Sequence, residues 1–402
     1  MIKTYIPRER YIEKIKPFID KDIIKVFTGQ RRVGKSYMLF HVMDLLLEKG
    51  IKEKNIIYIN KELHEFEDIK THKDLIEYIN KIKLKNQKNY IFIDEVQEID
   101  KFEKALESLL AEGGFDIYCT GSNANMLSGE LATYLSGRYI EIKIFGLSYL
   151  EFLKFHRLEK NKDSFFKFIK YGGLPYLINL SLEDDVIYEY LINIYNAILF
   201  KDVVKRHGVR NIAFLEKLIE YVADNTGSIV SAKKISDFLK SQKINISPNV
   251  IIEYLNYLTN AFFLFKASRS EIGGKKIFKI DEKYFFEDLG LRHSVIGYKQ
   301  TDISKILENI VFLHLKILGY KITVGKLYDK EIDFVCEKLG EKIYIQVVYL
   351  INNEKTIERE FGNLLKIKDN YRKIVVSMDE VIGNKYKGIE QINILDFLCM
   401  EV

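Results

Sequence analysis

The chain has 402 residues, 47% of them hydrophobic, which is too long for one compact core and suggests two or three domains. The three cysteines are widely spaced, which argues against a disulfide-rich protein and favours the cytoplasm. The N-terminus has no apolar signal core, which argues against export, and no apolar run approaches the ~18 residues that span a bilayer, which argues against a membrane protein. The formal net charge is only +5, but residues 201–276 carry 13 Lys and Arg against 7 Asp and Glu, so the basic excess lies in the middle of the chain.

The first predicted strand, Ile23–Thr28, leads into a glycine-rich loop and then into a helical pattern over Ser36–Leu47. The loop fits the phosphate-binding pattern G-x-x-x-x-G-K-[ST] at every fixed position. The nucleotide-binding residues predicted from it are Gly29, Gln30, Arg31, Arg32, Val33, Gly34, Lys35, Ser36 and Tyr37.

The residue types of this loop suit a nucleoside triphosphate. Gly29 and Gly34 let the backbone N–H groups approach phosphate oxygens closely. Lys35 would neutralise the β- and γ-phosphates, and the Ser36 hydroxyl would bind Mg²⁺. A chance match in a loop is the alternative, but the strand before the loop and the helix after it favour a nucleotide site.

Residues 1–150 alternate strand and helix patterns, which predicts an α/β fold with a doubly wound parallel sheet covered on both faces. The further strands are expected at Asn55–Asn60, Tyr90–Ile93 and Asp116–Thr120. The further helices are expected at His72–Ile82 and Phe102–Leu110.

Asp94 and Glu95 follow the strand Tyr90–Ile93, at the sheet edge where ligands bind in open α/β sheets. We expect Asp94 to hold Mg²⁺ through water. Glu95 would be the general base that deprotonates the water attacking the γ-phosphate. The alternative is two solvated carboxylates in a turn after a core strand.

Further polar residues come next in the chain. Ser122 and Asn123 follow the strand Asp116–Thr120 and are predicted to sense the γ-phosphate, unless they only form a turn. Arg138 precedes a strand-like stretch, Tyr139–Ile144, and is a candidate arginine finger or sensor cation, since a guanidinium suits transition-state charge on a phosphoryl group. The alternative for Arg138 is a solvated surface arginine.

Five segments of this chain, GQRRVGKS, YIFIDEVQEI, YCTGSNANML, LSGRYIEIKIFGLSYLEF and YGGLP, resemble in this order the bacterial and archaeal AAA-type ATPases. The resemblance implies an AAA+ core over residues 1–150, a helical lid over 151–205, a winged helix over 206–298 and a restriction-endonuclease-like domain over 299–402. It places YGGLP in a turn of the lid.

The resemblance also bears on ligand and assembly. The opening YIPRERYIEKI, with Arg8 and Tyr11, resembles the segment that closes over the base in that family, which implies adenine nucleotides. Members of the family form rings or other assemblies in which the arginine of one subunit completes the site of its neighbour. Arg138 stands at the family's recurrent Gly-Arg position, so a homo-oligomer with Arg138 acting in trans is one reading.

Residues 201–290 have the pattern of a winged helix: a helix capped by Ser231, a second helix from Pro248 and a hairpin after Ala261. The second helix, which usually enters the DNA major groove, contains no Lys or Arg. Phosphate contacts would therefore come from other lysines, which are Lys233, Lys234, Lys240, Lys243, Lys275 and Lys276. Duplex DNA binding through residues 201–276 and a protein-docking or structural role are both open.

The last hundred residues predict an α/β domain with a mixed sheet. Glu308, Asp333 and Gln346 fall where a PD-(D/E)xK nuclease places its helix Glu, its metal-binding Asp and the acid of its E-x-K pair. Here that pair is Gln346 and Val348. Because a neutral amide binds a hard cation poorly and a valine cannot act as acid or base, we expect a degenerate, inactive nuclease-like site.

These patterns predict an ATPase that binds ATP and Mg²⁺, releases ADP and phosphate, and drives or switches a DNA- or protein-binding C-terminal half. The main alternative is an ATP-gated, metal-dependent nuclease acting on DNA, and a third is a nucleotide-binding scaffold with negligible turnover. The complete GKS and Asp-Glu elements favour turnover, and Gln346 with Val348 count against the nuclease.

Overall fold

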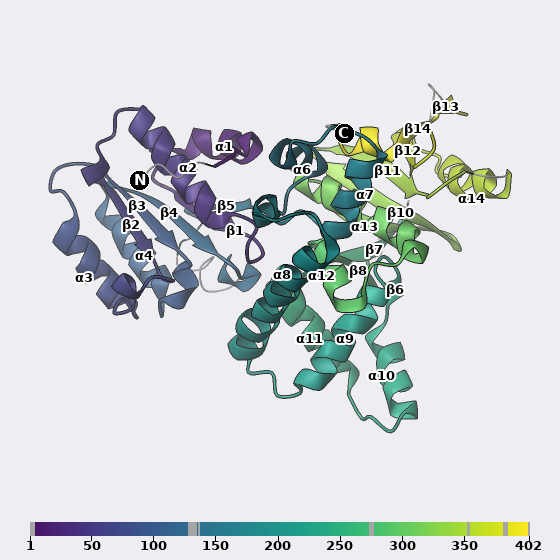
Figure 1. Cartoon of the computed structure of the whole chain (residues 1–402), viewed down its shortest axis with the longest axis horizontal. Helices are drawn as coiled ribbons and strands as arrows, with labels where there is room; N and C mark the ends of the chain where they lie inside the picture. Colours follow the sequence, from purple (N-terminus) through teal and green to yellow (C-terminus); the bar gives the residue numbers. More distant parts are fainter. Residues whose placement is uncertain are drawn as a thin grey trace. The chain divides into compact units, whose positions relative to one another are not determined.

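The computed structural model describes residues 5–127, 135, 137–272, 277–351, 354–380 and 385–400. The chain forms two compact units. The first comprises residues 1–145 and 260–262, and the second comprises 146–259 and 263–402 (Figure 1).

The first unit has a parallel sheet of five strands in the order β2-β3-β4-β1-β5. The strands are β1 (Ile24–Thr28), β2 (Ile56–Asn60), β3 (Asn89–Asp94), β4 (Phe115–Gly121) and β5 (Tyr139–Lys143). Every residue of β1, β3 and β4 is buried, which is why these segments read as nearly continuous apolar runs. The predicted α/β fold with a parallel sheet is confirmed.

Helices cover both faces of this sheet. They are α1 (Glu9–Ile15), α2 (Lys35–Glu48), α3 (His72–Ile82) and α4 (Phe102–Glu112). In Figure 1, α3 and α4 lie side by side on the face opposite α1 and α2. Thr71 and Asp74 form a reciprocal capping box that fixes the start of α3, and Gly34, in a left-handed conformation, precedes α2.

The helices of the second unit are mostly in its first half. They are α6 (Tyr149–His156), α7 (Lys162–Tyr171), α8 (Asp184–Ala197), α9 (Ile212–Asp224), α10 (Ala232–Ser241), α11 (Pro248–Asn260), α12 (Leu289–Ile296), α13 (Ile303–Ile317), α14 (Glu354–Leu365) and α15 (Ile394–Phe397). Ser231 caps α10 by accepting a hydrogen bond from the Lys234 N–H, as the sequence predicts.

The second unit has one sheet of nine strands in the order β13-β14-β12-β11-β10-β9-β7-β8-β6. These strands are β6 (Ile229–Val230), β7 (Leu264–Glu271), β8 (Ile277–Phe286), β9 (Lys321–Leu327), β10 (Lys330–Lys338), β11 (Glu341–Val347), β12 (Arg372–Ser377), β13 (Lys385–Tyr386) and β14 (Ile389–Asn393). The hairpin predicted as the wing is β7 and β8, and β7 pairs in parallel with β9. The sheet therefore runs across the predicted boundary at residue 298. The predicted wing lysines Lys275 and Lys276 lie outside the described residues.

Helices α13 and α14 cover opposite faces of this sheet. The alternation of β10 shows this, since successive residues of a strand point to opposite sides. Phe334 packs against Phe312 of α13, and Phe312 also stacks on Phe285 of β8. The next residue, Val335, belongs to an apolar cluster that contains Phe361 and Leu364 of α14.

The YGGLP segment is a turn held by a buried carboxylate. Gly172 has φ +82°, and a Cβ there would lie 2.2 Å from Asp288 Oδ1, so glycine is required. Asp288 accepts hydrogen bonds from the N–H groups of Gly173 (2.7 Å) and Leu291 (2.9 Å). Its burial raises the pKa of this carboxyl to about 6.

Among the described residues, no helix has the length and apolarity that crossing a bilayer requires.

Candidate nucleotide-binding site

The phosphate-binding loop joins β1 to α2, with Gly29 at φ +149° and Gly34 at φ +97°. A Cβ at Gly29 would meet the Ile144 carbonyl oxygen at 2.1 Å, so a side chain there would displace backbone as well as strain it. The positive φ angles disfavour any residue other than glycine at both positions. The N-terminus of α2 faces the loop.

The Lys35 ammonium turns back into its own loop. Nζ donates to the carbonyls of Gly29 (3.1 Å) and Gln30 (3.0 Å) and lies 3.8 Å from Glu95 Oε1. Its side chain is 4% exposed. Two carbonyls of the phosphate-binding loop therefore hold the ammonium inside that loop.

Asp94 ends β3 in a buried, hydrogen-bonded position. Thr120 Oγ1 donates to Asp94 Oδ1 at 2.5 Å, and the Tyr58 hydroxyl donates to Oδ2 at 3.4 Å. Burial raises the pKa of Asp94, and the hydrogen bonds from Thr120 and Ser36 oppose that rise. The Ser36–Asp94 contact joins the two predicted Mg²⁺ ligands.

Glu95 takes the left-handed conformation (φ +56°) directly after β3. Its N–H donates to Thr120 Oγ1 at 2.8 Å, so one threonine fixes both acidic residues. The Gln97 side-chain amide donates to Glu95 Oε2 and, at 3.3 Å, to Ser122 Oγ. The structure thus brings Lys35, Ser36, Asp94, Glu95 and Ser122 together at the C-terminal edge of the parallel sheet.

The remaining loop residues have different surroundings. Val33 is fully buried, and the Gln30 side-chain amide is buried without a hydrogen-bond partner among the described residues. Arg31 lies 3.4 Å from Glu62, Arg32 is exposed at φ +70°, and Tyr37 is 47% exposed. Asn123, which follows Ser122, is partly exposed.

Arg138 lies at the other end of the sheet. Its carbonyl accepts a hydrogen bond from the Ile24 N–H at 2.9 Å, at the start of β1, whereas the phosphate-binding loop follows Thr28. Four residues of strand separate the two ends by about 13 Å. The structure therefore does not bring the exposed Arg138 side chain to the loop of its own chain.

Arg8 and Tyr11 are buried beneath the loop. Arg8 Nη1 donates to the carbonyls of Val33 (3.1 Å) and Phe145 (2.8 Å), and its guanidinium stacks 4.6 Å from the centre of the Tyr11 ring. The Tyr11 hydroxyl accepts from the Phe145 N–H at 3.2 Å. Both residues brace the loop in this conformation.

The second predicted site, in the other unit, is filled by an ammonium. Lys283 of β8 lies 2.7 Å from Glu308 and 2.7 Å from Glu331, with 4% of its side chain exposed. Burial favours the neutral amine, but the charges of Glu308, Asp333 and Glu331 outweigh it and raise the pKa of Lys283. Burial and the neighbouring Glu308 raise the pKa of Asp333 well above its usual range.

Gln346 is part of the same cluster, and both ends of its side-chain amide are hydrogen-bonded within the protein. Its Oε1 accepts from the Asp333 N–H (2.7 Å) and its Nε2 donates to Glu360 (2.8 Å). Val348 packs in the apolar cluster below α14. Within the described ranges, no three His, Cys, Asp or Glu side chains gather as a metal-binding group. The residues do not fit the metal that a PD-(D/E)xK fold implies.

Sequence reasoning missed several of these contacts. Thr120 had a signal, because it is a polar residue at the C-terminal end of a mostly apolar strand. Tyr58 and Gln97 had none beyond their nearness to the predicted edge. Lys283 could not be found, because its partners Glu308 and Glu331 are distant in sequence.

Comparison with known proteins places the whole chain. It is 41% identical over 408 residues to an uncharacterized protein of Haemophilus influenzae, covering 99% of this chain and 100% of that protein. It is 32% identical over 402 residues to the uncharacterized protein MJ1544 of Methanocaldococcus jannaschii, covering 93% of this chain and 85% of that protein. The chain belongs to the family of these two proteins.

Two parts of this family member match described domains. Residues 21–153 match the AAA domain, and residues 162–302 match a domain of unknown function, DUF8612. The AAA-type, P-loop ATPase part of the sequence resemblance is therefore confirmed. The lid, winged-helix and endonuclease-like assignments stay predictions.

Solved structures are only distantly similar. Aeropyrum pernix Orc1 in complex with DNA has a TM-score of 0.37 at 10% identity, over 73% of this chain and 93% of that chain. Thermotoga maritima RuvB has a TM-score of 0.36 at 14% identity, over 65% of this chain and 89% of that chain. Such similarity assigns no function.

Proposed function

We propose that this protein binds ATP with Mg²⁺ and hydrolyses it to ADP and phosphate. The observation that carries this proposal is the convergence of Lys35, Ser36, Asp94, Glu95 and Ser122 at one edge of a parallel sheet inside an AAA domain. The choice of adenine rests on the resemblance of the segment with Arg8 and Tyr11 to the base-closing segment of the AAA-type ATPases. The contacts of these two residues brace the phosphate-binding loop.

The residues present fit Mg²⁺. Ser36 and Asp94 supply a hydroxyl and a carboxylate in direct contact, and hard oxygen ligands with several retained waters are what this ion prefers. Ser36 and Asp94 would hold the ion, and the chemistry it would supply is neutralisation of the negative charge that develops during phosphoryl transfer. Thr120 and Tyr58 hold the Asp94 carboxylate in place for that task.

Each of the other residues would have a separate role in an in-line displacement at the γ-phosphorus. Lys35 would exchange its carbonyl partners for the β- and γ-phosphates. Glu95 would accept a proton from the water whose oxygen attacks the γ-phosphorus, as the bond to the β–γ bridging oxygen breaks. Ser122 would donate to a γ-phosphate oxygen. Arg138 would serve a neighbouring copy in trans, since it lies far from its own loop.

The nucleotide site is tested by measuring the rate at which the Lys35→Ala variant releases phosphate from Mg²⁺–ATP. Loss of the ammonium that faces the β- and γ-phosphates should reduce turnover about 100-fold or more. Excess EDTA should stop the wild type. Lys49→Ala, an exposed lysine at the end of the same helix, is the matched control and should keep wild-type turnover. Equal rates for Lys35→Ala and wild type would refute the proposal.

We further propose that the nucleotide cycle drives or switches a DNA- or protein-binding second unit. The exposed lysines Lys233, Lys234 and Lys240 on α10, with Lys243 just after it, support duplex DNA as the partner. The nuclease alternative is not favoured, because Lys283 occupies the carboxylate cluster and Gln346 and Val348 lack the required chemistry.

A further inference from the structure

The Gln97 side chain connects two strand ends of the candidate site. Gln97 lies in the short helix Val96–Glu98 after β3, and its Nε2 donates to the Glu95 carboxylate and to Ser122 Oγ after β4. The left-handed turn at Glu95 directs the chain so that the side chain at position 97 returns to Glu95. Gln97 lies within the segment YIFIDEVQEI, but the sequence patterns assign it no role.

The orientation of this amide follows from chemistry. An ionised carboxylate only accepts hydrogen bonds, so the NH₂ group of Gln97 must face Glu95. The opposite atom, Gln97 Oε1, is buried and has no hydrogen-bond partner in the described part of the chain. A buried carbonyl without a partner is costly, and a residue retained only for packing would not need an amide here.

The backbone makes room for the amide. A Cβ at Gly121 would lie 3.0 Å from Gln97 Oε1 and 2.4 Å from Met126 Sδ. Glycine at the end of β4 therefore lets Gln97 lie against the strand that carries Ser122. The absence of a side chain at Gly121 thus leaves the space that Gln97 occupies at the edge of the sheet.

We propose that Gln97 is a positioning residue that couples the base, Glu95, to the phosphate-sensing hydroxyl of Ser122. Because Ser122 Oγ accepts the Gln97 N–H, its own O–H is directed away from Gln97 and is available to a γ-phosphate oxygen. The same amide holds one oxygen of Glu95, while the other faces Lys35 at 3.8 Å. Gln97 thereby sets base and sensor in one fixed relation when ATP binds.

This role of Gln97 rests on the proposed ATP hydrolysis, in which Glu95 takes one proton from water and ADP leaves as the water oxygen bonds to the γ-phosphorus. Gln97 exchanges no proton. Its contribution is to orientation, which acts on turnover more than on ATP affinity.

Steady-state kinetics of Gln97→Met and Gln97→Glu test this role. Methionine keeps the length without the donor, and glutamate keeps the shape while turning the donor into an acceptor. Each variant should lower kcat about 10-fold or more, because it removes a hydrogen bond to a charged group. The KM for ATP should change less than about 3-fold. Gln87→Met, an exposed glutamine of the same unit, should behave as wild type.

A double-mutant cycle with Ser122→Ala tests the coupling itself. If Gln97 and Ser122 act as one unit, the double variant loses little more kcat than the more impaired single variant. Multiplicative losses would overturn the coupling. Wild-type kcat in Gln97→Met would overturn the positioning role while leaving ATP hydrolysis intact, whereas a wild type without turnover would instead refute the proposed function.

Discussion

At the scale of single residues, Lys283 determines what the carboxylates of the second unit can do. Its ammonium brings one positive charge and three N–H donors to Glu308 and Glu331, beside Asp333. These groups are the kind that would otherwise bind a divalent cation. With the ammonium in place, the cluster is a buried ion network that joins β8 to α13 and β10.

Lys283→Met should lower the free energy of unfolding by about 3–5 kcal/mol at pH 8, because it leaves buried carboxylates without a counter-charge. The loss should be smaller at pH 5. Burial holds the pKa of Glu308 and Asp333 above their usual values, so in the folded state they take up protons as the pH falls and their repulsion is relieved.

Urea unfolding followed by circular dichroism at both pH values measures this difference. Lys342→Met is the control, because its ammonium pairs with Glu337 at the surface and should contribute less than about 1 kcal/mol. A Lys283→Met protein as stable as wild type at pH 8, or a loss larger at pH 5 than at pH 8, would contradict the assigned role.

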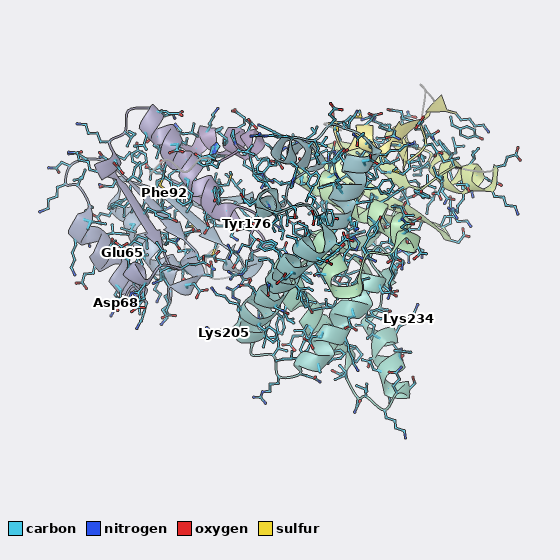
Figure 2. The ribbon with its side chains drawn as sticks, viewed as in Figure 1. Glu65, Asp68, Phe92, Tyr176, Lys205 and Lys234 are labelled. Carbon is cyan, nitrogen blue, oxygen red and sulfur yellow. The ribbon has the colours of Figure 1, made fainter. Side chains whose placement is uncertain are left out.

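At the scale of elements, α10 has a more suitable surface for nucleic acid than α11. The α10 lysines are exposed, and Phe238 among them is 57% exposed. Only Ile235 of α10 is buried, so the apolar stripe of this helix is narrow. Figure 2 shows Lys234 at the surface of α10. Exposed lysines suit the phosphates of duplex DNA.

Changing Lys233, Lys234, Lys240 and Lys243 together to Ala should weaken duplex DNA binding. It should also reduce the slope of log affinity against log salt by up to about 3.6, which is about 0.9 for each phosphate that a lysine no longer neutralises. Fluorescence anisotropy between 50 and 200 mM salt, as a rough working range, measures both effects.

A matched control replaces four exposed lysines of the first unit, Lys52, Lys54, Lys73 and Lys85, with Ala. It should leave the slope unchanged if α10 makes the contacts. The same slope in wild type and in the α10 variant would remove α10 from DNA binding.

Element boundaries in the AAA part could be predicted closely, because buried strands of a parallel sheet are short apolar runs with sharp ends. The strand expected at Asn55–Asn60 is Ile56–Asn60, and the helix expected at His72–Ile82 has these same bounds in the structure. The pairing of β7 with β9, Arg269 opposite Val324, was not predictable, since no local pattern records which distant strand lies alongside.

At the scale of the whole molecule, the groups suited to hydrolysis lie in the first unit and the exposed basic helix in the second. The motif residues of the first unit could be found from sequence because their spacing is fixed by the phosphate. The role of Gln97 could not be found, since it appears only when β3 and β4 lie side by side. A nucleotide cycle in one unit is the proposed source of free energy for binding in the other.

The most direct test of this account is Glu95→Gln, measured for ATP binding by calorimetry and for phosphate release. The amide keeps the shape of the side chain but cannot take a proton, so affinity should stay within about 3-fold of wild type while turnover falls about 100-fold or more. Glu98→Gln, an exposed position three residues on, should match wild type in both. Wild-type phosphate release by Glu95→Gln would contradict the central claim that Glu95 is the base of an ATP-hydrolysing site.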